Sequence, residues 1–518
     1  MDEYPARLRA IADLDVAGAR EEGGRHEYDG VVADLSRDGV AARLERLGDG
    51  AAFSDEHDEA HARAAEEALR VELGELQLHR SNPLRHIREL DLSCYEREYA
   101  PEPERLSARD RHVAQWPDAI DRAIAALDLV SAPAATAMLG AARGLADGVP
   151  EDDVPADIHD AALSAHRRLI THLETAEKSG PRDAALGRDA LARLMGTGEA
   201  VGVDVELLSQ RAEAERDRLM SRLAESAARI DPRREPMDVA RGVVGDHPDG
   251  ADVVEHARRW TALAQDFTRE YDLVPYHDGR CLVRLSPPSQ RWVVAALGLS
   301  GPAEDDSPAS FFVTPPDPQW PAEETAKWLQ LFSPANLAAI SVHEVAPGHF
   351  SHNRALRRTS GEVRRSLFSP AFVEGWAHYA EEMCLEEGFG AYAQEALGSD
   401  SFSAAHAEVG VWSEALVRVT RLAAAIGVHT GAMTIEQAAH RFAADTPHGG
   451  PAALSEARRA VVDPTYGRYT WGKLAILDLR ERAREAWGDA FTLRRFHTAL
   501  LDLGAPPLGL LDTALERG

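Results

Sequence analysis

Two short stretches of the sequence carry side chains that could bind a metal ion. The first is "SVHEVAPGHFSH", residues 341–352. His343 is followed at once by Glu344, as in the H-E-x-x-H motif of zinc peptidases, where the second histidine lies one helical turn after the first. In this chain that position holds Pro347, and the next histidine is His349. The motif is therefore H-E-x-x-P-G-H, which contains two extra residues.

The proline and the glycine decide whether this altered motif can bind an ion. In a straight α-helix the side chains of His343 and His349 would point about 240° apart and could not share a metal. Pro347 cannot donate a backbone hydrogen bond, and its ring clashes with the carbonyl group one turn earlier. Gly348 relaxes the limits on the backbone. We expect a bend at Pro347 that returns His349 to the face of His343; without the bend, this is an ordinary helix containing histidines.

The second stretch is "FVEGWAHYAEEM", residues 372–383. Its apolar residues recur at helical spacing, which predicts a helix packed in the core. Glu374, His378 and Glu381 lie about one turn apart and form a polar stripe beside the apolar face. Because a buried carboxylate is costly unless it is paired or metal-bound, Glu374 is the candidate third ligand. His378 is either a ligand or a histidine of the surrounding core.

Composition limits the classes of function. The 518 residues include 57 basic and 86 acidic side chains, for a net charge of −29. Such a charge argues against binding nucleic acid or anionic membranes. The acidic start "MDEYPARLRAIADLDV" lacks a secretory apolar run, no segment has the ~20 apolar residues of a membrane span, and the three cysteines are far apart. We expect a cytoplasmic protein, and these features do not determine its oligomeric state.

The chain is expected to be mainly α with one small β-sheet that flanks a deep cleft. Residues 1–235 are rich in strong helix formers, and Asp204 is placed to cap a helix. We interpret them as a helical N-terminal half that forms one cleft wall. Short β-prone runs ending in Pro, Gly or Ser predict a sheet at about 279–316. Residues 236–518 would form the catalytic half, with this sheet and both motif helices.

The sequence resembles the bacterial domain-of-unknown-function 885 family. The resemblance rests on "HEVAPGH", "EGWAHYAEE" and the later "PTYGRYTWGKLAILDLR". Members are predicted zincin-like metallohydrolases, related to helical gluzincin peptidases such as the carboxypeptidase Taq family. The resemblance implies a zincin-like, gluzincin-type fold and one Zn²⁺, or another divalent ion, held by His343, His349 and Glu374. Many members have a second histidine after the glycine, where this chain has Phe350; His352 is a candidate replacement.

The resemblance also implies catalytic roles. Glu344 would be the general base that takes a proton from a metal-activated water. Tyr469 matches the family's C-terminal tyrosine best, and either it or Tyr466 could donate a hydrogen bond to the oxyanion. The side chains expected to bind substrate or to surround the ligands are His378, Glu381, His429, Arg458, Arg468, Phe312 and Val313.

Several of these residues have two possible interpretations, one functional and one structural. Arg458 could bind a substrate carboxylate through two hydrogen bonds, or it could be a surface arginine. The strand from Phe311 to Thr314 could be the edge strand to which an extended peptide adds, or a structural strand. The two tyrosines and His429 could instead be core residues.

Three hypotheses about function follow. The first is a zinc-dependent peptidase or carboxypeptidase that acts on short peptides. The second is a catalytically silent binding or scaffold protein that lost its metal through the change to Phe350. The third is a metal-dependent amidase or esterase with a non-peptide substrate. Metal content and peptide hydrolysis, each with and without a chelator, would distinguish them.

Overall fold

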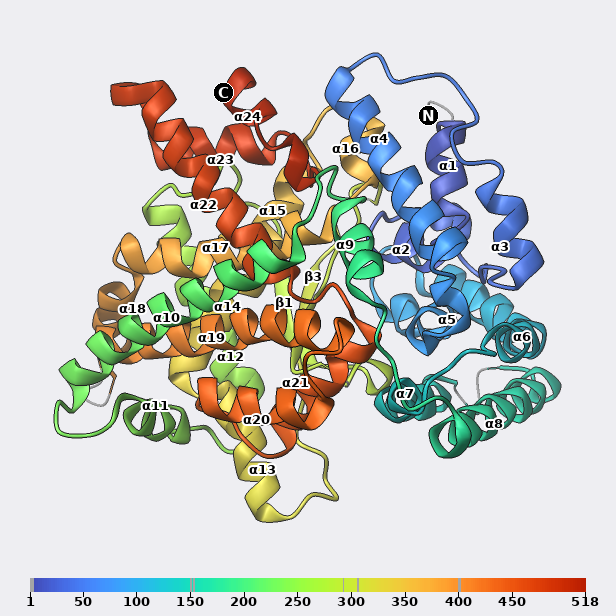
Figure 1. The fold of residues 1–518 in the computed structure, drawn as a ribbon, viewed down its shortest axis with the longest axis horizontal. Coiled ribbons are helices and arrows are strands. Elements are labelled where there is room, and N and C mark those ends of the chain that lie inside the picture. Colours follow the sequence, from blue (N-terminus) through green and yellow to red (C-terminus); the bar gives the residue numbers. More distant parts are fainter. Residues whose placement is uncertain (1–3, 150, 152–153, 292, 305–306, 399–401) are drawn as a thin grey trace.

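The computed structural model describes residues 4–149, 151, 154–291, 293–304, 307–398 and 402–518. These residues form many helices and one small sheet (Figure 1). The predicted fold class, mainly α with a single small sheet, is therefore confirmed. No helix in the described ranges is both long and apolar enough to cross a membrane.

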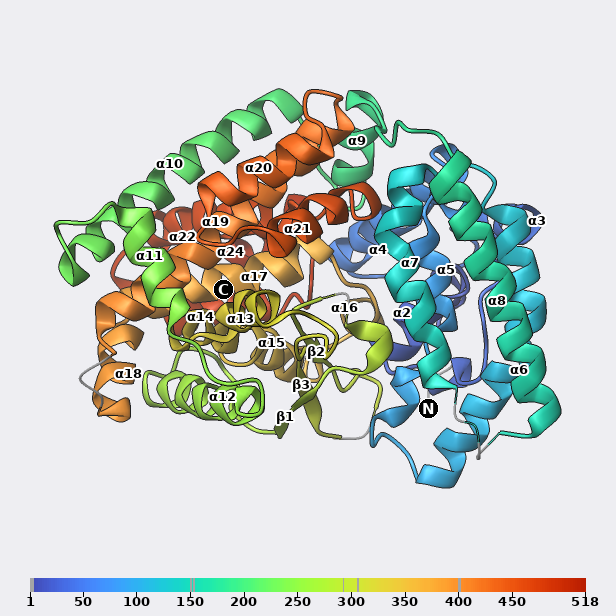
Figure 2. The same ribbon diagram turned by 90° about the horizontal axis from the view of Figure 1, so that it is seen from below.

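The N-terminal helices gather on one side of the molecule, blue to teal in Figures 1 and 2. Their bounds are α1 (Ala6–Ala12), α2 (Val16–Glu21), α3 (Arg37–Leu44), α4 (Glu56–Leu69), α5 (Pro83–Leu90), α6 (Glu102–Ala126), α7 (Ala132–Gly144) and α8 (Ala156–Ser179). Two apolar cores hold this side together, one around Leu8 and one around the fully buried Trp116.

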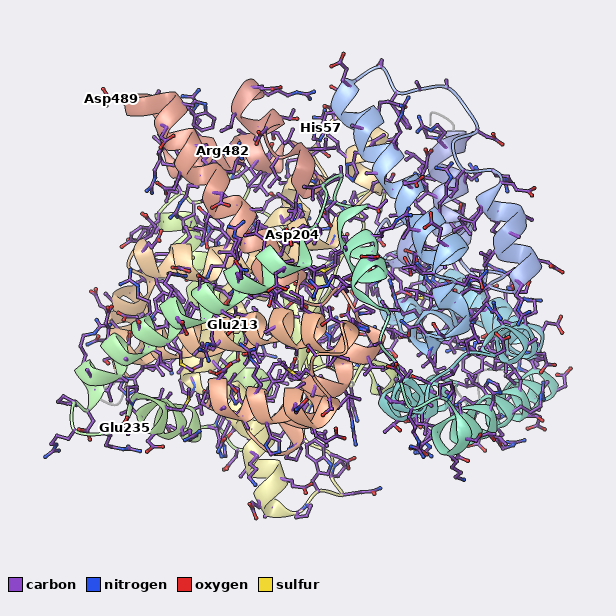
Figure 3. The ribbon with its side chains drawn as sticks, in the orientation of Figure 1. His57, Asp204, Glu213, Glu235, Arg482 and Asp489 are labelled. Carbon is purple, nitrogen blue, oxygen red and sulfur yellow. The ribbon has the colours of Figure 1, made fainter. Side chains whose placement is uncertain are left out.

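The next four helices run from this side into the rest of the molecule. They are α9 (Arg188–Gly196), α10 (Val205–Ile230), α11 (Pro236–Gly245) and α12 (Val253–Glu270). As the sequence predicts, Asp204 caps α10, because its side chain accepts hydrogen bonds from the backbone of Glu206 and Leu207 (Figure 3). α10 packs along α19 (Ala404–His429), so their shared apolar core crosses the boundary suggested near residue 235.

The remaining helices form the larger side of the molecule, yellow to red in Figure 1. They are α13 (Ala322–Leu329), α14 (Pro334–Glu344), α15 (His349–Leu356), α16 (Glu362–Ser366), α17 (Pro370–Glu386), α18 (Phe389–Leu397), α20 (Ile435–Asp445), α21 (Pro451–Val462), α22 (Arg468–Trp487), α23 (Leu493–Leu501) and α24 (Thr513–Arg517). Its core surrounds α17, whose Phe372 and Trp376 are fully buried.

The sheet lies within the predicted range and beside the N-terminal helices (Figures 1 and 2). Its strands are β1 (Cys281–Leu285), β2 (Ala295–Gly298) and β3 (Ala309–Val313). β3 lies in the centre, parallel to β1 and antiparallel to β2. Of the two interpretations of the strand that contains Phe312 and Val313, the edge strand is wrong and the structural strand holds, because both sides of β3 are paired.

Candidate metal centre

The altered motif forms a break between α14 and α15 and not a bend in one helix. Gly348 N–H donates to the carbonyl of Val342 (3.0 Å), and Ser351 N–H donates to that of Val345 (3.1 Å). A regular helix joins each N–H to the carbonyl four residues earlier. These bonds span six residues, so the wide turn absorbs the two extra ones.

Two contacts fix this turn. A Cβ atom on Gly348 would lie 1.9 Å from the carbonyl oxygen of His343, so no larger residue fits there. Trp376 of α17 donates its indole N–H to the carbonyl of Pro347 (3.0 Å). The "EGWA" segment therefore holds the "PGH" turn in place.

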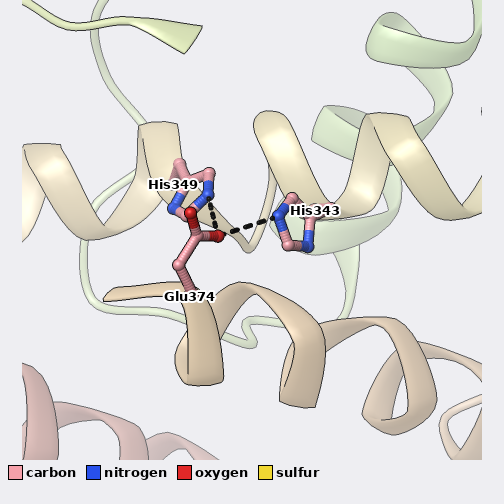
Figure 4. A group of neighbouring side chains, drawn as sticks. All are labelled: His343, His349 and Glu374. Carbon is pink, nitrogen blue, oxygen red and sulfur yellow. Dashed lines mark ion pairs between the residues drawn. The ribbon is translucent and has the colours of Figure 1, made fainter. Parts of the chain in front are cut away.

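The three predicted ligands converge (Figure 4). Oε2 of Glu374 lies 3.4 Å from Nε2 of His343 and 3.3 Å from Nε2 of His349. One ligand atom from each of the three side chains lies within 4.8 Å of the others. For ligands about 2.0–2.1 Å from a tetrahedral zinc, neighbouring ligand atoms are about 3.4 Å apart. The two measured separations match this value.

The chemistry of the group fits a metal ion. Glu374 Oε2 and His349 Nδ1 are buried without a hydrogen-bond partner in the described part of the chain. Only 5% of the His343 side chain, 12% of His349 and 19% of Glu374 is exposed. Two imidazole nitrogens and one carboxylate oxygen are a ligand set of catalytic zinc, which leaves a fourth position open.

Glu381 orients the first ligand. Its Oε1 lies 2.7 Å from Nδ1 of His343, and its Oε2 lies 3.3 Å from Nδ1 of His378. Arg418 Nη2 is 3.2 Å from the same carboxylate. A carboxylate on Nδ1 leaves Nε2 of His343 free to face Glu374, as in metal sites where a second residue fixes the histidine. His378 thus contacts Glu381 and is not one of the three converging side chains.

Burial and neighbouring charges shift the pKa values of this group. Burial and Arg418 lower the pKa of His343, but Glu374 and Glu381 raise it to about 9. Burial raises the pKa of Glu374, but its two histidine neighbours hold it well below the usual range. Burial raises the pKa of Glu344, which is 8% exposed and lies within the field of the ligand side chains.

Of the two candidate tyrosines, Tyr469 reaches the centre. Its ring is nearly parallel to that of His343, with centroids 6.1 Å apart, and Arg459 Nη2 donates to its hydroxyl oxygen (3.3 Å). Tyr466 is fully buried and donates its O–H to the carbonyl of Glu456 (3.2 Å) within an apolar core. Tyr466 is therefore placed as a core residue.

Three other residues that were predicted to bind substrate or to surround the ligands also differ in whether they lie near the centre. His429 is fully buried and donates from Nε2 to the carbonyl of Ala460 (2.8 Å), so its ring joins α19 to α21. Arg458 is exposed, and it is the next residue, Arg459, that contacts Tyr469. Arg468 lies near the centre, with its guanidinium carbon 5.7 Å from the Tyr469 ring centroid.

Neither Phe350 nor His352 belongs to the group of converging side chains. Phe350 is buried in the apolar core. His352 donates from Nε2 to the carbonyl of Gly504 (3.0 Å) and does not take part in the metal-ligand group. A second histidine at position 350 is thus not needed to bring three ligands together.

Sequence reasoning missed the buried charges of α19. Arg418 pairs with Glu414 (2.9 Å), and Arg421 pairs with Glu456 through two 2.7 Å hydrogen bonds. A signal was present, because Glu414, Arg418 and Arg421 recur at helical spacing within an otherwise apolar helix. Charges on the buried face of a helix indicate a polar site nearby.

Glu22, directly after α2, lies within the electrostatic field of Arg468 and the candidate ligand Glu374. Burial raises the pKa of Glu22, on which the charges of Arg468 and Glu374 also act. Glu22 pairs with Arg88 of α5 at 3.1 Å, and both side chains are about half exposed, at 52% and 41%. The N-terminal helices therefore place charged side chains within the field of the candidate ligand Glu374.

Fold and site together define a large helical protein with a two-histidine, one-glutamate centre at the break between two helices. A family model described as "Bacterial protein of unknown function (DUF885)" matches residues 18–515. The chain belongs to this family. A comparison with curated proteins found no match.

Solved structures share the fold over nearly the whole chain. A protein described as "a putative lipoprotein of unknown function" from Shewanella oneidensis is 18% identical, with a TM-score of 0.72, over 97% of this chain and 96% of that one. A protein described as a "putative lipoprotein" from Colwellia psychrerythraea is 16% identical, with a TM-score of 0.75, over 99% and 97%. At these identities the likeness concerns the fold alone.

Proposed function

We propose that the protein is a metal-dependent hydrolase, with zinc as the expected ion, that cleaves short peptides. The observation that carries this proposal is the convergence of His343 Nε2, His349 Nε2 and Glu374 Oε2 at separations of 3.3–3.4 Å about the carboxylate oxygen. A second observation supports the proposal: Glu374 Oε2 is buried and accepts no hydrogen bond within the described residues.

The chain's own groups have distinct roles in this proposal. A bound divalent ion supplies Lewis acidity toward the substrate carbonyl and toward water. Glu344, beside the ligands, takes the proton of the attacking water and passes it to the leaving amine. Tyr469 donates its O–H to the oxyanion, because its oxygen already accepts from Arg459. Glu381 keeps Nε2 of His343 directed at the ligand group.

β2 replaces β3 as the strand that could receive an extended peptide. It is the edge strand that contacts α14, and within the described residues its outer side has no strand partner. An extended peptide can pair with such an edge through main-chain hydrogen bonds.

The alternatives share parts of this site. A silent scaffold protein was suggested by Phe350, but that side chain lies in the core and takes no ligand position. An amidase or esterase would use the same residues on another substrate. The cytoplasmic location and a short-peptide substrate stay predictions; the two structural relatives are described as "putative" lipoproteins.

Metal analysis and a peptide library test the proposal. We expect the purified protein to contain about one divalent ion per chain and to hydrolyse a mixed library of short peptides, with activity lost in chelator and restored by zinc. Glu374→Ala should lose both ion and activity. Stoichiometric metal without cleavage of peptides, but with cleavage of amide or ester libraries, would move the assignment to the third hypothesis. Protein that binds no ion would contradict the proposal.

A further inference from the structure

Two arginines next to Tyr469 share a single carboxylate. Arg459 donates to Asp463 Oδ2 from Nε (3.2 Å) and Nη2 (3.0 Å). Arg468 donates to Oδ1 from Nη1 (2.6 Å) and to Oδ2 from Nη2 (3.0 Å). The single negative charge of Asp463 therefore neutralises only one of the two arginines. One positive charge is left over beside Tyr469.

Each of the other arginines of this region has carboxylate partners that it shares with no second arginine. Arg421 donates two hydrogen bonds to Glu456, and Arg418 forms ion pairs with both Glu414 and Glu381. Nε of Arg468 is buried without a hydrogen-bond partner in the described part of the chain, as is Nε of Arg418, but Arg468, unlike Arg418, shares its carboxylate with a second arginine. An unsatisfied buried donor on a charged group is costly, which favours a ligand that accepts from it.

The surplus charge lies close to the metal centre and within reach of a ligand. The guanidinium carbons of Arg459 and Arg468 are 5.9 and 5.7 Å from the Tyr469 ring centroid, which is 6.1 Å from that of His343. Their side chains are 18% and 17% exposed. At about 3.3–3.6 Å per residue of extended chain, only a few residues separate this place from the ligand group.

We infer that Arg459 and Arg468 form a subsite for the terminal carboxylate of a short peptide. This inference rests on the proposed function and makes the protein a carboxypeptidase-like enzyme that cuts near the C-terminus. A guanidinium group matches a carboxylate through two parallel hydrogen bonds, and a partly buried site strengthens the attraction. In the reaction, water adds to the scissile carbonyl, the C–N bond breaks, and the C-terminal fragment leaves as an amine that has gained a proton.

Binding tested separately from hydrolysis decides the inference. Full-length, zinc-loaded Glu344→Gln protein is immobilised and incubated with a library of two- to six-residue peptides, half with a free C-terminal carboxylate and half amidated. Retained peptides are identified by mass spectrometry. We expect free acids to be retained about tenfold or more over their amides. Arg459→Gln and Arg468→Gln, introduced in the same protein, should abolish this preference, whereas the exposed neighbour changed in Arg458→Gln should keep it.

Each outcome of the peptide-retention experiment either supports or overturns the proposed subsite. Equal retention of acids and amides, or no retention of either, would overturn the subsite, as would loss of the preference in Arg458→Gln alone. Retention confined to peptides with Asp or Glu, regardless of amidation, would overturn the terminal assignment in favour of side-chain carboxylates. Preferential retention of free acids without hydrolysis by the wild-type protein would refute the proposed function and uphold the subsite. If Arg459→Gln does not fold, Arg459→Lys keeps the charge without the fork and should reduce the preference.

Discussion

Gly375 and Gly472 touch backbone to backbone where α17 crosses α22. A Cβ atom on Gly375 would lie 2.5 Å from Cα of Gly472. Gly375 directly follows the candidate ligand Glu374, and α22 carries Tyr469 near its start. The close crossing therefore sets the separation between a candidate metal ligand and the proposed oxyanion donor.

Gly375→Ala should force the two helices apart. We expect a loss of about 1–3 kcal/mol in the free energy of unfolding, as for other overpacked cores, and weaker metal binding. Denaturant unfolding and chelator competition measure the two effects. Gly140→Ala is the matched control, because a Cβ there meets no atom within 4 Å; in helix α7 it should stabilise by about 0.5–1 kcal/mol. A Gly375→Ala protein as stable as wild type would show that the crossing is loosely packed.

Glu344→Gln should separate binding from chemistry. The amide keeps the size of the side chain but cannot take a proton, so we expect normal metal content and a 10²–10⁴-fold lower kcat, the range for a general base. Metal analysis, thermal unfolding and hydrolysis of the best library peptide provide the measurements. Loss of metal together with activity would make Glu344 a ligand or a structural carboxylate.

Glu381→Gln should weaken metal binding without removing a ligand. Glu381 accepts from Nδ1 of His343 at 2.7 Å, and loss of such an outer partner typically costs about 10–100-fold in metal affinity. Competition with a fluorescent zinc chelator gives the dissociation constant. Glu395→Gln, an exposed change on α18, serves as the control. Unchanged affinity in Glu381→Gln would mean that the backbone alone orients the histidine.

The contact of His26 with Glu304 should make stability depend on pH. Burial lowers the pKa of His26, but Asp29 and Glu304 raise it from 6.5 to about 9. Because the folded pKa is the higher one, the stabilisation is complete below about pH 6.5 and is lost as the pH rises through about 9. Since His26 is partly exposed, we expect only about 1 kcal/mol after solvent screening.

Denaturant unfolding at pH 6 and pH 10 measures how much His26 contributes to the pH dependence of stability. His26→Gln removes the titrating group and should flatten the difference by the same amount. An identical pH dependence in wild type and variant would assign the effect to other groups.

The sequence predicts those features that local signals carry. Pro347 and Gly348 indicate a helix interruption. Helical spacing places Glu374, His378 and Glu381 on one stripe. The three candidate ligands follow from that geometry. Short β-prone runs likewise locate the sheet.

Features that depend on distant pairing or on a single helical step were missed. The central place of β3 follows from its register with residues 281–285 and 295–298, which no periodicity reveals. Arg458 and Arg459 differ by one residue, yet a step of about 100° around α21 leaves Arg458 exposed and brings Arg459 to Tyr469. The same limit applies to Tyr466, which lies in the turn before α22, and Tyr469, which lies in the first turn of that helix.

His349 belongs to a helix that is anchored outside the motif. Through His352 and Asn353, α15 hydrogen-bonds to the carbonyls of Gly504 (3.0 Å) and Ser300 (2.8 Å). No continuous run of helical bonds fixes the distance between His343 and His349 across the break. Their approach therefore depends both on the turn, which Trp376 of α17 contacts, and on the docking of the chain near residue 504. Metal affinity and the docking of the C-terminal segment are then thermodynamically linked, so an ion would stabilise tertiary structure far beyond its ligands.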